Sequence, residues 1–98
     1  MSHVRLSARA LADLARLHQF LVIKDKDAAK RAVLAIREAF LPLARFPLMG
    51  RPVDDSQDLR ELVIDFGASG YLALYRFEIG LDVVTILAIK HQREDDYR

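Results

Sequence analysis

The sequence predicts an α+β fold in which an N-terminal helical hairpin packs on a small, mainly antiparallel sheet, in the order β-α-α-β-β-β. Apolar residues recur at three- and four-residue spacing in the first half of the chain. In the second half, strand-like runs are separated by short glycine turns. A chain of 98 residues, 52% of them hydrophobic, has the length and composition of one packed domain, 1–98.

The first element is a short strand that leads directly into a helix. In HVRLS, Val4 and Leu6 alternate with polar residues, which is typical of an edge strand. Ser7 is a good N-cap residue. The apolar spacing that follows predicts an amphipathic helix over about residues 8–23. Its apolar stripe consists of Leu11, Leu14, Leu17, His18 and Leu21.

A second helix is expected over about residues 27–45. The stretch KDKD at 24–27 interrupts the first helix, and Asp27 can cap the second. Pro42 has no backbone N–H, so the helix should kink or loosen there. Because the link is short, the two helices should form an antiparallel hairpin. The second apolar stripe consists of Ala29, Ala32, Val33, Ile36 and Phe40.

The rest of the chain is expected to be a loop followed by three strands. FPLMGRPVDDSQD, residues 46–58, contains two prolines, a glycine and three aspartates, which indicates a loop. LRELVIDF and YLALYRFEI alternate in hydropathy and are joined by the tight turn GASG, so they should pair as a hairpin. VVTILAIKH is apolar on both faces, which favours a central strand.

Composition excludes several classes of site. Cysteine is absent, so there is no disulfide and no thiolate metal site, which fits a reducing, cytoplasmic location. The N-terminus lacks the apolar core of a signal peptide, and no apolar run approaches the ~20 residues that cross a bilayer. The sequence contains no metal-site spacing, nucleotide-binding glycine loop or nucleophile triad, so we expect neither metal nor cofactor.

Charge is distributed unevenly along the chain. Residues 1–50 contain nine Lys or Arg and four Asp or Glu, a net charge of +5, whereas residues 51–98 contain six and ten, a net charge of −4. An acidic surface is poorly suited to attract RNA. A basic surface favours an acidic partner.

Five side chains in the second half could carry chemistry or bind a partner. His91 ends the last strand and could be a general acid or base, or a surface histidine. Arg60 and Arg76, on neighbouring strands, could hold a phosphate or carboxylate, or pair with acids within the sheet. Arg51 lies in a loop that glycine and proline constrain. Tyr97 could be a base only if its pKa were strongly lowered.

Four segments, in order and at the right spacing, resemble the RelE/ParE superfamily of type II toxin–antitoxin toxins. They are FPLMGRPV, LRELVI, YLALYRF and VTILAIKHQREDDY. The succession is most similar to ParE-type toxins, often described as plasmid-stabilisation proteins, and it covers essentially the whole chain. The resemblance implies growth arrest on expression, a ParD-like antitoxin as partner, and no cofactor.

The resemblance leaves two activities open. RelE-type members are ribosome-dependent ribonucleases that cut mRNA, whereas ParE-type members poison DNA gyrase and block replication. Cleavage of RNA needs a base, an acid and cations, and the resemblance assigns these roles to Arg60, Arg76, His91 and Tyr97. Lysine is absent from both middle strands, and Lys90 alternates to the face opposite His91. We therefore favour the gyrase poison, with the nuclease and a non-toxic interaction module as alternatives.

Under the favoured interpretation no residue is catalytic, and the toxin alone is not expected to bind nucleic acid. The antitoxin should lie along the helices as an acidic extended or helical segment, because a two-layer fold leaves apolar helix surface uncovered. The expected target-binding residues are Arg51, Arg60, Arg76, His91 and Arg93. The expected antitoxin-binding residues are Leu17, Phe20, Leu34 and Leu41.

Overall fold

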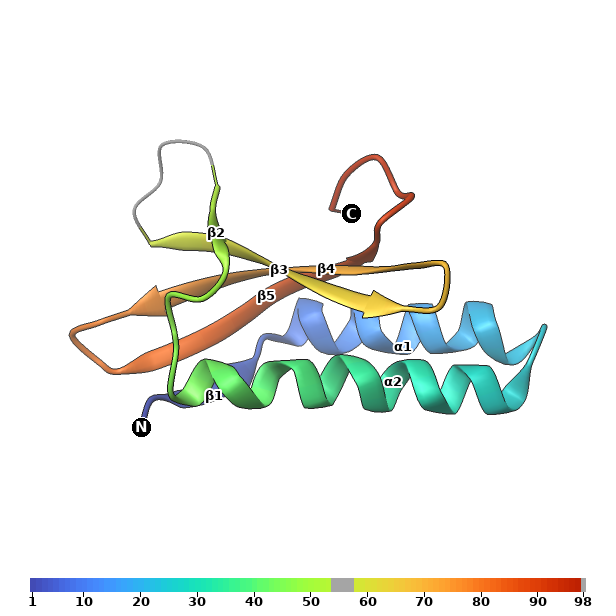
Figure 1. The fold of residues 1–98 in the computed structure, drawn as a ribbon, viewed down its shortest axis with the longest axis horizontal. Coiled ribbons are helices and arrows are strands. Elements are labelled where there is room, and N and C mark those ends of the chain that lie inside the picture. The colour runs from blue at the N-terminus through green and yellow to red at the C-terminus, as the bar shows by residue number, and fades with distance from the viewer. Residues whose placement is uncertain (54–57, 98) are drawn as a thin grey trace.

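A computed structural model, which describes residues 1–53 and 58–97, has the predicted α+β fold (Figure 1). The two helices lie side by side and cover one face of a sheet, while the C-terminal segment lies over the other face. The elements are β1 (His3–Leu6), α1 (Ala8–Val22), α2 (Lys26–Phe40), the 3₁₀ helix η1 (Leu41–Ala44), β2 (Arg51–Pro52), β3 (Leu59–Phe66), β4 (Ser69–Glu78) and β5 (Val83–His91).

The sheet has the strand order β1-β5-β4-β3-β2. Strands β3, β4 and β5 form the predicted antiparallel meander, and β1 pairs in parallel with β5 at the edge. β5 therefore lies between two strands, as its apolar character on both faces predicted. Leu74 lies opposite Ala88 and Tyr75 opposite Ile86, so Leu87 is an extra residue that forms a bulge in β5.

Two local predictions were wrong. The predicted loop 46–58 contains a strand, β2, in which Arg51 pairs with Glu61 and Pro52 with Arg60; residues 54–57 of that prediction lie outside the described residues. Proline fits there because β2 is an edge strand. The N-cap of α2 is Asp25 and not Asp27, because Asp25 has extended backbone and its carboxylate accepts from the amides of residues 27 and 28.

Other helix signals are confirmed. The Ser7 hydroxyl accepts from the amide of Ala10 at 3.1 Å and caps α1. α2 ends at Phe40 and continues as η1 through Pro42, so the α-helical bonding loosens where the proline predicted it. Neither helix is long and apolar enough to span a membrane in the part of the chain that the structure describes.

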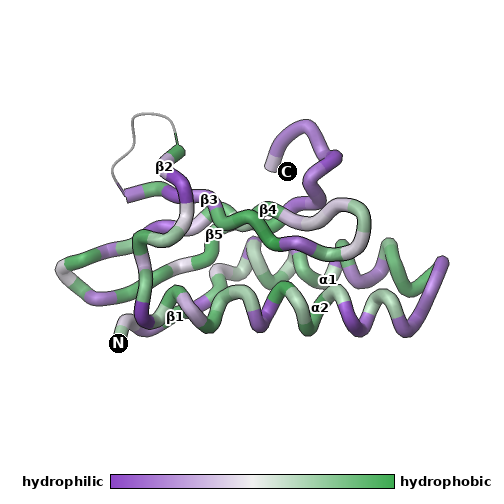
Figure 2. The backbone as a smooth tube through the Cα atoms, in the orientation of Figure 1, coloured by the Kyte–Doolittle hydropathy of each residue, from purple (hydrophilic) through white to green (hydrophobic). Residues whose placement is uncertain are grey.

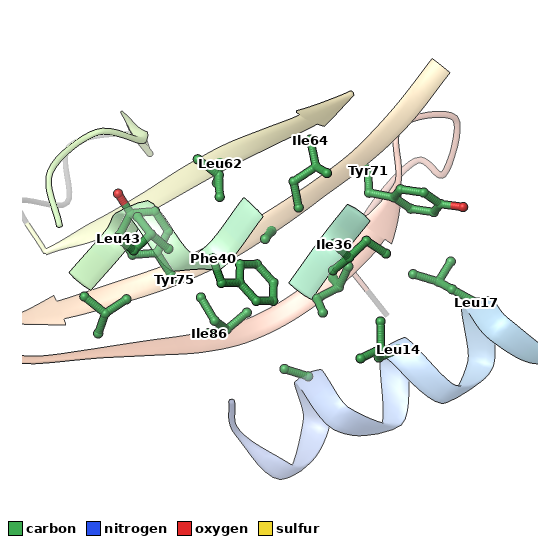
Figure 3. Packing of buried hydrophobic residues seen from close by; sticks show 14 of the residues in the cluster. Leu14, Leu17, Ile36, Phe40, Leu43, Leu62, Ile64, Tyr71, Tyr75 and Ile86 are labelled. Atoms are coloured by element: carbon green, nitrogen blue, oxygen red, sulfur yellow. The ribbon is translucent and has the colours of Figure 1, made fainter. Parts of the chain in front are cut away.

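The core lies between the helical hairpin and the sheet (Figure 3). Leu17 is only 6% exposed and belongs to this core, so it is not available to an antitoxin and that prediction was wrong. It follows Leu14 by three residues, on the same face of α1, and both point toward the sheet (Figure 3). Leu11, which was expected on the inward stripe, is half exposed instead.

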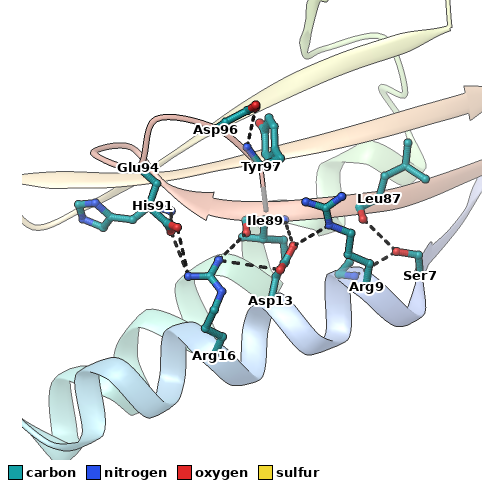
Figure 4. Close-up of polar contacts among 11 residues, drawn as sticks. Ser7, Arg9, Asp13, Arg16, Leu87, Ile89, His91, Glu94, Asp96 and Tyr97 are labelled. Atoms are coloured by element: carbon teal, nitrogen blue, oxygen red, sulfur yellow. Dashed lines mark hydrogen bonds and ion pairs between the residues drawn. The ribbon is translucent and has the colours of Figure 1, made fainter.

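Side chains of α1 bind the backbone of β5 beyond the point where β1 ends (Figure 4). The Ser7 hydroxyl donates to the carbonyl of Leu87 at 3.1 Å, and the buried Asp13 carboxylate accepts from the amide of Ile89 at 2.9 Å. Arg16 donates to the Ile89 carbonyl at 3.4 Å and also neutralises Asp13 across 3.9 Å. These contacts satisfy backbone groups that a neighbouring strand would otherwise pair.

Candidate functional site

Four side chains on the sheet face turned away from the helices form a charged network, the open-face cluster, which consists of Arg51, Glu61, Lys90 and Tyr97. Tyr97 donates its hydroxyl hydrogen to Glu61 at 2.6 Å, and Arg51 donates from Nε to the other carboxylate oxygen at 2.9 Å. The Lys90 ammonium lies 4.9 Å from the centre of the Tyr97 ring. Figure 2 shows that the segment bearing Tyr97 is mostly hydrophilic and lies above more hydrophobic strands.

The network shifts two pKa values in opposite directions. Burial alone would raise the pKa of Glu61, but hydrogen bonds from Tyr97 and Arg51, with the charges of Arg51 and Lys90, hold it below its usual value. Burial raises the pKa of Tyr97 far above its ordinary value, and the hydrogen bond to Glu61 raises it further. The phenol therefore stays protonated near neutral pH and cannot act as a general base there.

The ring of His91 contacts residues of β4 and of the turn that follows β5. It extends on the same side of the sheet as its cross-strand partner Tyr71, with the two rings in an edge arrangement 5.4 Å apart. Its Nδ1 accepts from the amide of Arg93 at 3.1 Å, so Nε2 carries the proton and donates to the Ser69 hydroxyl at 3.1 Å. In Figure 4 the imidazole points away from Tyr97.

Arg60 and Arg76 lie on opposite faces of the sheet. Arg60 is paired with Tyr75 and extends on the helix side, where it donates to the carbonyls of Leu48 at 3.1 Å and Gly50 at 2.8 Å. Arg76 extends on the open face, with Nε 3.5 Å from the carboxylate of Asp58. Glu61 forms its ion pair with Arg51.

The four residues named for the nuclease are thus divided between the two faces. Arg60 and His91 are on the helix side, while Arg76 and Tyr97 are on the open face. Lys90 lies on the face opposite His91, as the sequence predicted, but it was not expected to belong to a site, and the pairing of Arg51 with Glu61 was missed. The pairing could have been found only from the register of β2 on β3, which places these two residues opposite each other.

A second feature is an apolar groove on the outer surface of the helical hairpin. It has a volume of about 270 Å³ and lies between Leu11 and His18 of α1 and Val33 and Arg37 of α2. Three of the four residues expected to bind an antitoxin are exposed on the hairpin or at its end: Phe20, Leu34 and Leu41. An apolar groove with basic residues beside it suits an amphipathic, acidic segment.

Comparison with known proteins identifies relatives over nearly the whole chain. Residues 4–96 match the family described as ParE toxin of type II toxin-antitoxin system, parDE. The chain is 38% identical over 94 residues to Toxin RelE3 of Caulobacter vibrioides, covering 96% of this chain and 98% of that protein. It is 32% identical over 89 residues to Putative toxin Y4kP of Sinorhizobium fredii, covering 91% and 90%.

Solved structures show the same fold. The chromosomal ParDE system of P. aeruginosa superposes with a TM-score of 0.76 at 24% identity, covering 93% of this chain and 96% of that one. The toxin–antitoxin complex RelBE2 of Mycobacterium tuberculosis superposes with a TM-score of 0.67 at 28% identity, covering 93% and 98%. The relatives carry both ParE and RelE names. This chain belongs to the ParE family of type II toxin–antitoxin toxins, within the RelE/ParE superfamily.

Proposed function

We propose that this toxin arrests growth by binding DNA gyrase through its surface, and that it does not cut RNA. The observation that carries the proposal is the separation of the four nuclease candidates onto two faces of the sheet. Attack of a ribose 2′-hydroxyl needs a base, an acid and cations within reach of one phosphate. A Tyr97 that is held protonated on Glu61 supplies no base.

Neutralisation of cations on the open face supports the same proposal. Arg51 is paired with Glu61, and Arg76 lies against Asp58. Lys90 is buried beneath the C-terminal segment, where it donates to the carbonyl of Glu94 at 3.2 Å. A face whose cations already have protein partners has little attraction for a phosphate backbone. A protein target fits this face better, and action on gyrase implies a cytoplasmic toxin.

Replacing His91 by Gln should leave growth arrest largely intact, because Gln keeps a hydrogen-bonding side chain and loses only the ability of an imidazole to take up and release a proton. Replacing Arg76 or Arg93 by Glu should weaken arrest, since both are proposed to lie at the target interface. Arg60 is a less direct test because its guanidinium also binds the 46–50 loop. Each purified variant would be assayed with gyrase and supercoiled plasmid, and separately with programmed ribosomes.

If the toxin were a nuclease, the His91 substitution would have a larger effect than the arginine substitutions. Loss of a general acid or base typically lowers a rate ~10²–10⁴-fold, so His91→Gln would then nearly abolish arrest. Ribosome-dependent cuts in mRNA that disappear in His91→Gln, with gyrase unaffected, would overturn the proposal in favour of the nuclease. An absence of growth arrest from the wild-type chain would instead support a non-toxic interaction module.

We also propose that a ParD-like antitoxin lies along the outer surface of the helical hairpin. Solved relatives of the same fold include toxin–antitoxin complexes, which supports a partner of this kind. The exposed Phe20, Leu34 and Leu41 supply apolar contacts, and the net charge of +5 on residues 1–50 favours an acidic segment.

Replacing Phe20 by Asp should weaken antitoxin binding about tenfold or more, because it removes a large exposed anchor and adds a charge that repels an acidic segment. The affinity of the wild-type toxin should also fall as salt rises. Calorimetric titration of purified antitoxin measures both effects. Val63→Asp, on the open face, is the matched control and should bind normally. Equal affinities for the two variants, with no salt dependence, would contradict this docking surface.

A further inference from the structure

The loop between η1 and β2 holds three large apolar side chains in solvent. Phe46, Leu48 and Met49 are 62%, 55% and 50% exposed. Together with Pro47 and Phe77 of β4 they line a hollow of about 460 Å³, which we name the apolar cup. A cluster of exposed apolar side chains marks an interaction site more often than single exposed leucines do. The expected docking sites on the hairpin and among the arginines do not include these residues.

The sheet holds the loop in this exposed conformation. The Tyr75 side chain is fully buried, and its hydroxyl accepts from the amide of Gly50 and donates to the carbonyl of Pro47, both at 2.8 Å. Arg60 adds its two bonds to the carbonyls of Leu48 and Gly50. The backbone is therefore fixed at Pro47, Leu48 and Gly50, and the apolar side chains cannot turn inward without breaking these hydrogen bonds.

We infer that the toxin binds its protein target through the apolar cup, which is the anchor of that interface. The inference rests on the proposed function only in requiring that the target be a protein. Phenylalanine and methionine are enriched at the centres of protein interfaces, and Arg45 and Asp82, which lie beside Pro47 and Phe77, supply the polar rim that such centres have. The side chains that line the cup are apolar and cannot donate hydrogen bonds to a phosphate group, so the cup does not suit a nucleic acid.

Charge and position assign the cup to the target and not to the antitoxin. Glu78 and Asp82, at the β4–β5 turn beside Phe77, would repel the acidic segment that the basic helices favour. The tip of the helical hairpin lies at the other end of the molecule from this loop (Figure 1), and among the exposed residues expected to bind the antitoxin Leu41 lies nearest the loop in sequence. Arg60, one of the arginines expected to bind the target, instead contacts the loop of the cup through the carbonyls of Leu48 and Gly50. An apolar side chain of the target, with a basic neighbour facing Asp82, is the occupant that fits.

The test compares Leu48→Asp and Met49→Asp with Phe20→Asp, all at exposed positions where a charge leaves the core unchanged. The cup variants should need at least about tenfold more toxin for growth arrest, while their antitoxin affinity stays within about threefold of wild type. Phe20→Asp should show the opposite pattern. Leu48→Met, which keeps an apolar side chain, should restore arrest. Melting temperatures within a few degrees of wild type would show that each variant is folded.

Growth arrest does not depend on which protein is the target, so the outcomes separate the two proposals. Cup variants that lose arrest while wild-type toxin leaves purified gyrase active would support the anchor and refute gyrase as the target. Unchanged arrest in Leu48→Asp would overturn the anchor whatever gyrase does. A loss of antitoxin affinity as large as the loss of arrest would also overturn it, because the cup would then belong to the antitoxin surface.

Discussion

Replacing Gly70 by Ala is expected to prevent stable folding, and with it both toxicity and antitoxin binding. Gly70 lies in β4 opposite Asp65 of β3. A Cβ atom at this position would be 2.0 Å from the carbonyl oxygen of Ile64, which is backbone of the adjacent strand. Rotation of a side chain cannot relieve that contact, so the two strands must separate. We expect a loss of about 4 kcal/mol or more, a large part of the stability of a domain of this size.

Gly80→Ala is the matched control. Gly80 lies in the turn between β4 and β5, and a Cβ there would have no heavy atom within 4 Å. Urea unfolding followed by circular dichroism should place Gly80→Ala within about 1 kcal/mol of wild type. Gly70→Ala should be largely unfolded without urea. If both variants unfolded at the wild-type midpoint, the close approach of β4 to β3 would be refuted.

Replacing Tyr75 by Ala should cost about 3–5 kcal/mol, the range observed when a large buried aromatic side chain is removed. The Tyr75 ring lies in the core between the helices and the sheet, near Leu43 and Phe40 (Figure 3). The same substitution also removes the hydroxyl that bonds Gly50 and Pro47. The core and the 46–50 loop should therefore be weakened together.

Tyr75→Phe separates these two contributions. It retains the ring and removes only the hydroxyl, which leaves the buried Gly50 amide unpaired at a cost of about 1–3 kcal/mol. Hydrogen exchange at the Gly50 amide should accelerate in Tyr75→Phe by more than exchange at amides in the centre of β5. Exchange at Gly50 that matches wild type would contradict the role of the hydroxyl in holding the loop.

The periodicity of apolar residues was sufficient to predict the helices and strands that are long enough to repeat their pattern several times. The meander of β3, β4 and β5 follows from alternation and glycine turns, and α1 begins at Ser7 as its side-chain chemistry indicates. Leu17 and Asp13 show what the periodicity of a helix could not predict. A helical stripe does not specify which arc faces the sheet, and Asp13 is buried because the Ile89 amide needs an acceptor. The sequence does not show that the Ile89 amide lacks a strand partner until β1 is known to end at Leu6.

The candidate site was less predictable because it depends on register. Arg60 and Arg76 were correctly placed on adjacent strands, yet Arg76 lies opposite Leu59, one residue away from Arg60. Since neighbouring residues of a strand point to opposite faces, that offset of one separates the two guanidinium groups. The two-residue strand β2 is too short for any periodic signal, and without it the pairing of Arg51 with Glu61 has no sequence basis.

The place of β5 in the sheet has a consequence for synthesis of the toxin. This strand is made after the other four, but it is hydrogen-bonded on both sides, to β4 and to β1, and Asp13 binds Ile89 across 76 residues of chain. Contacts between such distant segments cannot form until the final strand has left the ribosome. A nascent chain interrupted before residue 83 lacks the strand that joins its two ends. The chain therefore cannot adopt the toxin fold until β5 has been made and has left the ribosome.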